Sequence, residues 1–130
     1  MSPGRRPVVL IVDDEPRILS ALHRTLRREG YELLIAETVE RALEVVEQTA
    51  IDCVLSDHRM PGMSGLDLLE RVAARWPDAG RLLITGWNVE IEPDELARVG
   101  VREVLNKPWD DAELKRALRD ACDAAAAGSS

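Results

Sequence analysis

Three carboxylates and a lysine stand at the ends of apolar runs, and together they have the chemistry of a phosphate or metal site. Asp13 and Asp14 follow the first apolar run of the chain, and Asp57 follows the apolar residues 53–55 after a single serine. A carboxylate at the C-terminal end of a buried strand lies at the rim of an α/β sheet, where such folds place their chemistry. We therefore predict that Asp57 accepts a phosphoryl group.

Three carboxylates at one sheet edge repel one another, and partial burial strengthens the repulsion. A hard divalent ion offsets this charge, and Mg²⁺ prefers carboxylate oxygens, waters and phosphate oxygens as ligands. On spacing alone, three solvated loop acids are the alternative. Lys107 favours a site, because its ammonium can neutralise the carboxylates and hold a phosphoryl oxygen. The Thr85 hydroxyl and the backbone N–H of Gly86 end the fourth apolar run and supply further donors to an anion.

The elements that must position these residues alternate between strand and helix five times. Short apolar runs rich in β-branched residues predict buried strands. Thr38, Ser64 and Asp110 are the expected N-caps of the second, third and last helices. The predicted strands cover residues 7–12, 32–36, a third segment ending at 56–57, 81–85 and 101–105.

Five βα units predict a parallel sheet with right-handed crossovers and helices on both faces. The length suits an α/β fold of the flavodoxin-like, doubly wound (βα)5 type with strand order 2-1-3-4-5. In this order the first and third strands are neighbours, so Asp13, Asp14 and Asp57 converge at the switch point. We expect the folded domain over residues 7–123, a disordered tail over 1–6, and a linker or tail over 124–130.

The composition predicts one soluble domain, because 130 residues leave no room for a second core. A net charge of −7 argues against direct nucleic-acid binding, which needs a basic face. No segment approaches the roughly 20 apolar residues of a membrane span, and the N-terminus lacks the apolar core of a signal peptide. Cys53 and Cys122 match no metal motif and are expected to be buried free thiols. The cytoplasm is the expected compartment.

Four motifs carry a family resemblance: VDDEP, SDHRMPGMSG, LLITG and LNKPW. With them, residues 7–121 resemble the receiver domains of response regulators in two-component signalling, of the kind found in single-domain chemotaxis receivers. The combination is highly specific, although DD or KP alone would mean little. The resemblance implies a phosphoprotein switch. Such a switch catalyses its own phosphorylation and dephosphorylation at Asp57, rather than acting on an outside substrate.

The resemblance implies a phosphodonor and a metal. Asp57 takes its phosphoryl group from a sensor histidine kinase or a phosphotransfer protein and becomes a 4-aspartylphosphate. Asp14, Asp57 and the backbone carbonyl of Arg59 bind Mg²⁺, and Asp13 acts through a metal-bound water. The expected readers are an output domain or a downstream protein. A homodimer through the face made by helix 4, strand 5 and helix 5 is a further expectation.

The resemblance also implies how the phosphoryl group is held. Lys107 pairs with the acceptor carboxylate and then with the phosphoryl oxygens. Thr85 is the switch hydroxyl that moves to bond the new phosphoryl group, and the backbone at Gly86 and Arg59 completes the phosphoryl site. The Lys107–Pro108 bond is expected to be cis, because X–Pro bonds lose most of the usual trans preference.

The chain departs from the family pattern in the part that reads the switch. Receivers usually carry Tyr or Phe three residues before the lysine, and here that residue is Val104. Either Thr85 and backbone shifts act alone, or Trp87 or Trp109 replaces the missing ring. The fourth helix is expected to be short, over residues 94–99 after an extended 88–92 segment. The alternative is an ordinary helix that starts near residue 89 and bends at Pro93.

Two histidines and two other functions were weighed against this interpretation. His23 is expected on the solvent face of the first helix. His58 is expected to be a solvated loop residue, with gating of the site as its alternative. A small phosphohydrolase would need an acid at the position of Arg59, and a flavin or nucleotide domain would need a glycine-rich loop after the first strand. The tail favours a receiver from a longer regulator over a free-standing one.

Overall fold

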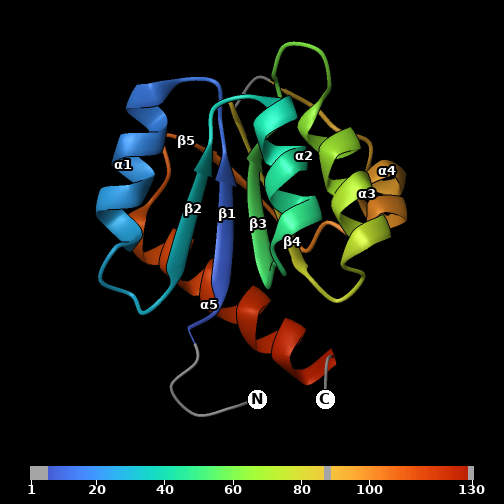
Figure 1. Ribbon diagram of the computed structural model, residues 1–130. Helices are drawn as coiled ribbons and strands as arrows, with labels where there is room; N and C mark the ends of the chain where they lie inside the picture. Colours follow the sequence, from blue (N-terminus) through green and yellow to red (C-terminus); the bar gives the residue numbers. More distant parts are fainter. Residues whose placement is uncertain (1–5, 87–88, 129–130) are drawn as a thin grey trace.

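The computed structural model of the protein describes residues 6–86 and 89–128, in which five strands alternate with five helices (Figure 1). The expected alternation of βα units is therefore present from end to end. The elements are β1 (Val8–Val12), α1 (Pro16–Leu26), β2 (Glu32–Ala36), α2 (Val39–Gln48), β3 (Cys53–Asp57), α3 (Gly65–Arg75), β4 (Gly80–Gly86), α4 (Pro93–Val99), β5 (Glu103–Lys107) and α5 (Asp111–Gly128).

The strands form one parallel sheet in the order β2-β1-β3-β4-β5, which confirms the predicted flavodoxin-like fold. The register brings the C-terminal ends of the strands to one edge. Val12 pairs with Ser56 across β1 and β3, and Asp57 pairs with Ile84 across β3 and β4. Residues that directly follow these positions therefore meet at that edge, as the switch-point rule requires.

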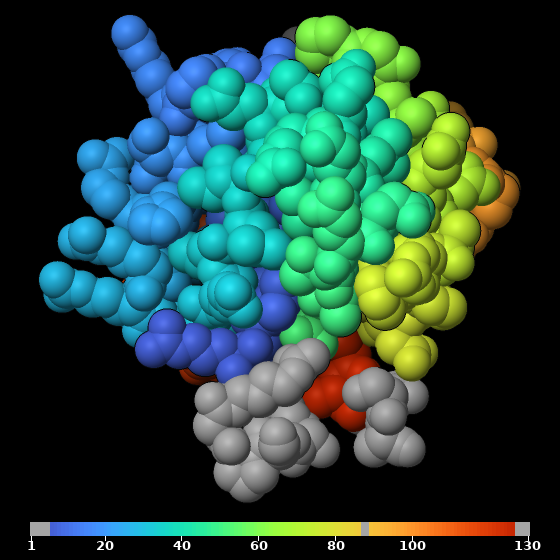
Figure 2. Space-filling view, in the orientation of Figure 1, coloured from blue at the N-terminus to red at the C-terminus, as the bar shows by residue number. Residues whose placement is uncertain are grey.

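Helices cover both faces of the sheet, and each face has its own apolar core. All five residues of β1 are buried, and they alternate between the two cores because neighbouring strand side chains point to opposite faces. The core beneath α2 and α3 includes Leu10, Val54 and Leu69, and the core beneath α1 and α5 includes Ile11 and Leu118. Figure 2 shows the molecule from the side that α2 and α3 cover.

Local signals place several helix starts where the sequence predicts them. The Thr38 hydroxyl accepts a hydrogen bond from the backbone N–H of Arg41, and the Ser64 hydroxyl accepts one from the N–H of Asp67. The Asp110 carboxylate accepts a bond from the N–H of Glu113 at the start of α5. Each cap satisfies a donor that the first helical turn leaves unpaired.

The structure differs from the sequence-based expectations at three boundaries. β5 runs over Glu103–Lys107, two residues later than predicted, so Lys107 is the last residue of the strand and not part of a loop. α4 begins at Pro93, which makes the alternative of a longer helix from residue 89 wrong. α5 continues to Gly128, through much of the segment expected as a linker or tail. Among the described residues, no helix is both long and apolar enough to cross a membrane.

Candidate functional site

The C-terminal ends of β1 and β3 bring together the three carboxylates that the sequence singles out. Oxygens of Asp13, Asp14 and Asp57 all lie within 4.8 Å of one another. Asp13 and Asp57 are buried, whereas Asp14 is exposed. The alternative of three solvated acids is therefore wrong for two of the three side chains. The cluster therefore has two buried carboxylates and one carboxylate that is open to solvent.

Asp13 is the fixed part of the cluster. Its side chain is fully buried, its Oδ1 accepts a hydrogen bond of 2.9 Å from the backbone N–H of Glu15, and its own N–H donates to the Ala36 carbonyl. The other oxygen, Oδ2, lies 2.9 Å from Lys107 Nζ. Both oxygens of this buried carboxylate therefore have partners, as burial of a charge requires.

Lys107 connects the two buried carboxylates. Its Nζ lies 2.9 Å from Asp13 Oδ2 and 3.2 Å from Asp57 Oδ1. Burial lowers the pKa of Lys107, but the hydrogen bond and the charge of Asp13, followed by those of Asp57, outweigh burial and raise that pKa. The ammonium is therefore charged at neutral pH. The Lys107–Pro108 peptide is cis, as expected.

At Asp57 the interactions that disfavour the charged carboxylate outweigh those that favour it. Burial and the nearby charge of Asp13 raise the pKa of its carboxyl group, and Lys107 opposes them only in part. Its Oδ1 faces the lysine, whereas its Oδ2 accepts no hydrogen bond from any residue that the structure describes. Asp57 is therefore a buried carboxylate with one oxygen beside a cation and one oxygen without a hydrogen-bond partner among the described residues.

The backbone of Asp57 is held tightly against the start of α3. The Ser56 hydroxyl donates a 2.9 Å hydrogen bond to the Asp57 carbonyl, and the N–H of Gly65 donates to the carbonyl of His58 at 2.7 Å. A methyl group on Gly65 would collide with the Asp57 carbonyl oxygen. Only glycine fits at this point, so the first residue of α3 and the last of β3 are locked together. Sequence reasoning assigned no role to Ser56 or Gly65.

Thr85 and Gly86 end the neighbouring strand at the same edge. Gly86 pairs with Lys107 in the register of β4 and β5, and Thr85 follows the residue that pairs with Asp57. Thr85 is buried, and its hydroxyl makes no hydrogen bond within the described part of the chain. The hydroxyl is therefore available to a new partner at this edge of the sheet.

The donor set fits a hard divalent cation. Three carboxylates share a single ammonium, which leaves the cluster with excess negative charge. Oxygen donors of this kind are the ligands that Mg²⁺ prefers. The Arg59 carbonyl accepts no hydrogen bond from the described residues, so it is free to act as a further oxygen donor, and the Arg59 side chain is exposed.

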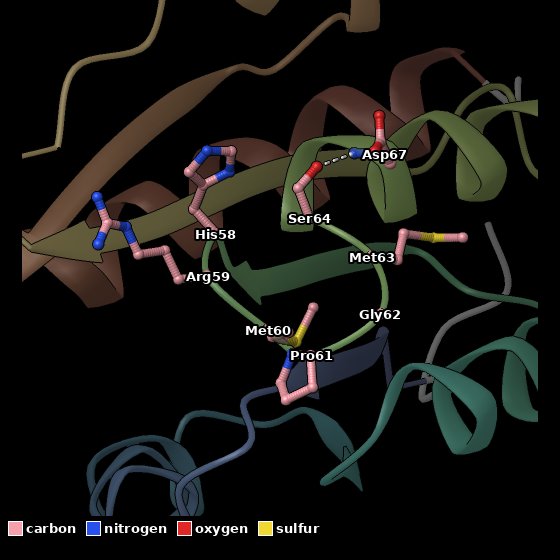
Figure 3. A pocket seen from close by; sticks show the side chains of 8 residues that line it. All are labelled: His58, Arg59, Met60, Pro61, Gly62, Met63, Ser64 and Asp67. Carbon is pink, nitrogen blue, oxygen red and sulfur yellow. Dashed lines mark hydrogen bonds between the residues drawn. The ribbon is translucent and has the colours of Figure 1, made fainter.

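The loop after Asp57 lines a shallow hollow beside the cluster, over residues 58–64 and Asp67 (Figure 3). Figure 3 shows the His58 ring on the side of the loop where Ser64 starts α3, whereas the Arg59 side chain extends away from it. His58 was expected to be solvated, but it is half-buried and its Nδ1 is buried without a hydrogen-bond partner. Burial, followed by the Arg59 charge, lowers the pKa of His58. His23 is exposed, as expected.

The residues considered for the missing aromatic lie on different faces of the sheet. Val104 is half-buried and packs against the core beneath α2 and α3. Trp109 packs against the core beneath α1 and α5, and its Nε1 donates to Asp111. Trp109 therefore lies on the wrong face to fill the place of a ring at position 104. Trp87 lies outside the described residues.

Comparisons with known proteins agree with this geometry. Residues 9–119 match the family model of the response regulator receiver domain. The chain is 34% identical over 117 residues to the hydrogenase transcriptional regulatory protein HoxA of Bradyrhizobium diazoefficiens, covering 87% of this chain and 23% of that protein. It is 33% identical to HoxA of Cupriavidus necator, covering 92% of this chain and 25% of that protein. The chain thus spans about a quarter of the length of these relatives.

Solved structures show the same likeness over nearly the whole chain. The signal receiver domain of an HD domain-containing protein from Pseudomonas fluorescens superposes with a TM-score of 0.85 at 33% identity, covering 95% of this chain and 99% of that one. A CheY-like receiver domain protein from Methanospirillum hungatei gives 0.88 at 27% identity, with the same coverage. The chain therefore belongs to the family of response regulator receiver domains, the phospho-accepting modules of two-component signalling.

Proposed function

We propose that Asp57 is the phosphoacceptor of this receiver and that the surrounding cluster is its reaction site. One observation carries the proposal. Asp57 presents an unengaged Oδ2 beside two other carboxylates, while its Oδ1 is held 3.2 Å from the ammonium of Lys107. No other carboxylate in the described chain combines burial, a cation and a free oxygen at the edge of the sheet where such folds act.

The reaction we infer is the transfer of a phosphoryl group to Asp57. Oδ2 attacks phosphorus, an O–P bond forms, and the bond between phosphorus and the donor nitrogen breaks. The donor imidazole is protonated on its other ring nitrogen, so it keeps the electron pair of the broken P–N bond and leaves as a neutral ring. Phosphoryl transfer depends on positioning and on charge stabilisation more than on covalent machinery. The raised pKa of Asp57 also makes its carboxylate more basic, and so a better nucleophile, than a solvated one.

The neighbouring residues hold charge and geometry during this transfer. Lys107 keeps Oδ1 in place and is close enough to contact a phosphoryl oxygen once the bond has formed. Asp13 fixes Lys107 from below through its 2.9 Å contact. Ser56 and Gly65 hold the Asp57 backbone, so the attacking oxygen starts from one defined position. Such pre-positioning lowers the entropic part of the barrier.

We infer that Asp14, Asp57 and the Arg59 carbonyl hold Mg²⁺, with Asp13 acting at longer range. When bound, the ion supplies positive charge that stabilises the charge developing on the transferred group. The support is the donor set, which has three carboxylates within 4.8 Å and only one lysine to balance them. Metal binding and the assignment of each ligand are parts of the proposal.

We infer that Thr85 carries the signal away from the site. Thr85 is a buried residue whose hydroxyl makes no hydrogen bond in the described structure, so a phosphoryl oxygen on Asp57 offers it a partner, together with the backbone of Gly86. Phosphorylation adds acceptor oxygens and charge, which can bias a two-state surface. Because Val104 replaces the usual ring and Trp109 lies on the other face, we propose that Thr85 and the β4–α4 backbone act without an aromatic partner.

The wider setting is also a proposal. The donor is a sensor histidine kinase or a phosphotransfer protein, and the reader is an output domain or a downstream protein of a longer regulator in the cytoplasm. The relatives named HoxA are transcriptional regulatory proteins of much greater length than this chain. A homodimer through the α4–β5–α5 face is retained as a candidate. In the described chain, charges on that face pair internally, as Arg116 does with Glu103 at 2.7 Å.

The test is intact mass after incubation with acetyl phosphate and Mg²⁺. We expect one added phosphoryl group, lost when the metal is chelated and lost in Asp57→Asn. Asp67→Asn is the matched control, because Asp67 is an exposed carboxylate in the same loop region but outside the cluster. A folded protein that gains no adduct, or a Asp57→Asn variant that still gains one, would overturn the assignment.

A further inference from the structure

The helix that follows Thr85 in the chain, α4, has little buried surface. In α4 (Pro93–Val99), the last residue, Val99, is buried, Leu96 is half-buried, and the other five residues are exposed. The N-cap residue, Glu92, makes no side-chain capping bond. A helix of two turns with so little buried surface is not fixed by its own packing. Its position therefore depends on Ile91, which packs against the core just before the helix, and on the polar contacts at its C-terminal end.

Arg81, at the start of β4, supplies the main contact at that end. Its Nε donates to the Val99 carbonyl at 3.0 Å, and one terminal nitrogen donates to the carbonyls of Pro77 and Ala79 at 3.1 and 3.0 Å. The guanidinium thus bridges the end of α4 and the turn that follows α3. All three acceptors are backbone carbonyls, so the bridge does not depend on the identity of a partner side chain.

Gly100 shapes the place where this guanidinium lies. It has φ +77°, and its N–H donates to the carbonyls of Leu96 and Ala97. A side-chain carbon at Gly100 would come within 2.6 Å of a terminal nitrogen of Arg81. The glycine therefore does two things at once: it ends the helix in a left-handed conformation, and it leaves room for the guanidinium.

The electrostatics favour a cation at this point. The C-terminal end of a helix carries partial negative charge from carbonyls that lack helical partners, and Arg81 meets one of them directly. The side chain is half-buried, and that burial lowers the pKa of Arg81, but an arginine stays charged at any physiological pH. A second contact, Arg98 to Glu70 of α3 at 2.7 Å, lies at the same end but is exposed and screened.

We propose that Arg81 is a positioning residue that makes the C-terminal end of α4 the pivot of the switch. This inference rests on the proposed role of Thr85 in sensing the phosphoryl group. One rigid strand, β4, carries Arg81 near its start and Thr85 near its end, about 13 Å apart at strand spacing. A change at Thr85 therefore reaches α4 through the segment before Pro93, while Arg81 holds the far end of the helix still.

The proposed pivot predicts which end of α4 moves. The N-terminal turn of α4 should move when the site is occupied, and the turn at Val99 and Gly100 should not. If Arg81 were absent, the whole helix would respond and would also open more readily at rest. The two ends of a seven-residue helix are thus expected to differ in local stability.

Hydrogen exchange of the full chain, followed by mass spectrometry, tests the resting state. In Arg81→Met we expect amides 96–101 to exchange about tenfold faster than in the unaltered protein, as loss of bonds worth roughly 1.4 kcal/mol would produce. Arg81→Lys keeps the charge but lacks the fork that reaches several carbonyls, so it should restore little protection. Arg71→Met, on the exposed side of α3, is the control and should leave these amides unchanged.

Unchanged exchange at 96–101 in a folded Arg81→Met variant would overturn the pivot. If that variant does not fold, the same comparison is made with Arg81→Lys, and wild-type exchange there would overturn it equally. The second arm adds beryllium fluoride and Mg²⁺ as the phosphoryl mimic. We expect altered exchange at 89–95 but not at 96–101 in the unaltered protein, and at both in Arg81→Met. If the protein takes no phosphoryl group at all, the proposed function fails, while the resting-state comparison still tests the contact.

Discussion

The carboxylate cluster at the ends of β1 and β3 and the α4 region after β4 are built in opposite ways. In the cluster, buried charges meet fixed partners: Lys107 serves both Asp13 and Asp57 at 2.9 and 3.2 Å. In the α4 region, one buried side chain and backbone contacts from Arg81 hold a seven-residue helix. We infer from this difference that the proposed reaction site is set before any partner binds, whereas the proposed readout region is easier to move.

The strongest test of this comparison removes the cation of the cluster. Lys107→Met leaves Asp13 buried beside Asp57 without a counter-charge, so the free energy of unfolding should fall by on the order of 3 kcal/mol in metal-free buffer. Phosphorylation by acetyl phosphate should slow by about 100-fold, because one fixed positive charge is lost. Urea unfolding and intact mass measure the two effects.

Lys115→Met, which removes a partly exposed lysine from α5, is the control and should change neither quantity by much. The pH dependence follows from the raised pKa of Lys107. Its contribution is fully present below the unfolded-state value, near pH 10.5, and is lost as the pH rises through the higher folded-state value. The difference between Lys107→Met and the unaltered protein should therefore be constant around neutral pH. A difference that disappeared between pH 6 and 8 would contradict the assigned ion pairs.

The next largest effect concerns the rigid attachment of β3 to α3. In Gly65→Ala the new methyl group meets the Asp57 carbonyl, a backbone atom that has no rotamer to change. We expect a loss of roughly 2 kcal/mol in unfolding free energy and slower phosphorylation. Gly62→Ala is an informative comparison, because its cost should come from a φ of +88° and not from a collision. Equal phosphorylation rates in Gly65→Ala and the unaltered protein would remove the case for pre-positioning.

A smaller effect, of opposite sign, is expected at Asp57, the proposed phosphoacceptor. Asp57→Asn removes a buried charge while Lys107 keeps Asp13, so the metal-free protein should become more stable by on the order of 1 kcal/mol. The pKa of Asp57 is raised, so the folded state binds its proton more tightly than the unfolded state does. The stability of the unaltered protein relative to Asp57→Asn should thus fall as the pH rises from the unfolded-state pKa of Asp57, near 3.8, through its higher folded-state pKa. At higher pH it should level off.

Mg²⁺ sharpens the same measurement. Saturating metal should stabilise the unaltered protein, by about 2.7 kcal/mol at a hundred times the dissociation constant, and should stabilise Asp57→Asn much less. Thermal unfolding with and without the ion separates the two cases. A variant that gained as much from Mg²⁺ as the unaltered protein would show that Asp57 is not a ligand.

The smallest expected change lies in the readout region. Val104 is half-buried and packs against the core beneath α2 and α3. Val104→Tyr should alter the free energy of unfolding by less than about 1 kcal/mol, because the added ring can remain partly at the surface. Hydrogen exchange at 89–95 on adding the phosphoryl mimic should nevertheless change. An identical response in both proteins would place the readout elsewhere.

The sequence predicted the fold and the site more completely than it predicted the readout. Apolar runs and N-caps such as Thr38 and Ser64 act locally, so their effects can be inferred from neighbouring residues. β5 was misplaced by two residues because its only fully buried side chain is Leu105 and its pattern is weak. Arg81 gave no signal, since its acceptors are carbonyls of residues brought near only by the fold. The burial of His58 likewise depends on packing outside its own loop.

The single ammonium shared by two carboxylates has a consequence for the lifetime of the signal. Conversion to an acyl phosphate removes the charge of the Asp57 carboxylate, but a phosphoryl group brings nearly two negative charges in its place. The site is then more negative than before, with Asp13 and Asp14 unchanged and one lysine to balance them all. Hydrolysis of the acyl phosphate would relieve that repulsion, so the proposed acceptor site would also disfavour keeping the phosphoryl group. On the proposed function, the excess of negative charge in the cluster would therefore limit the lifetime of the signal.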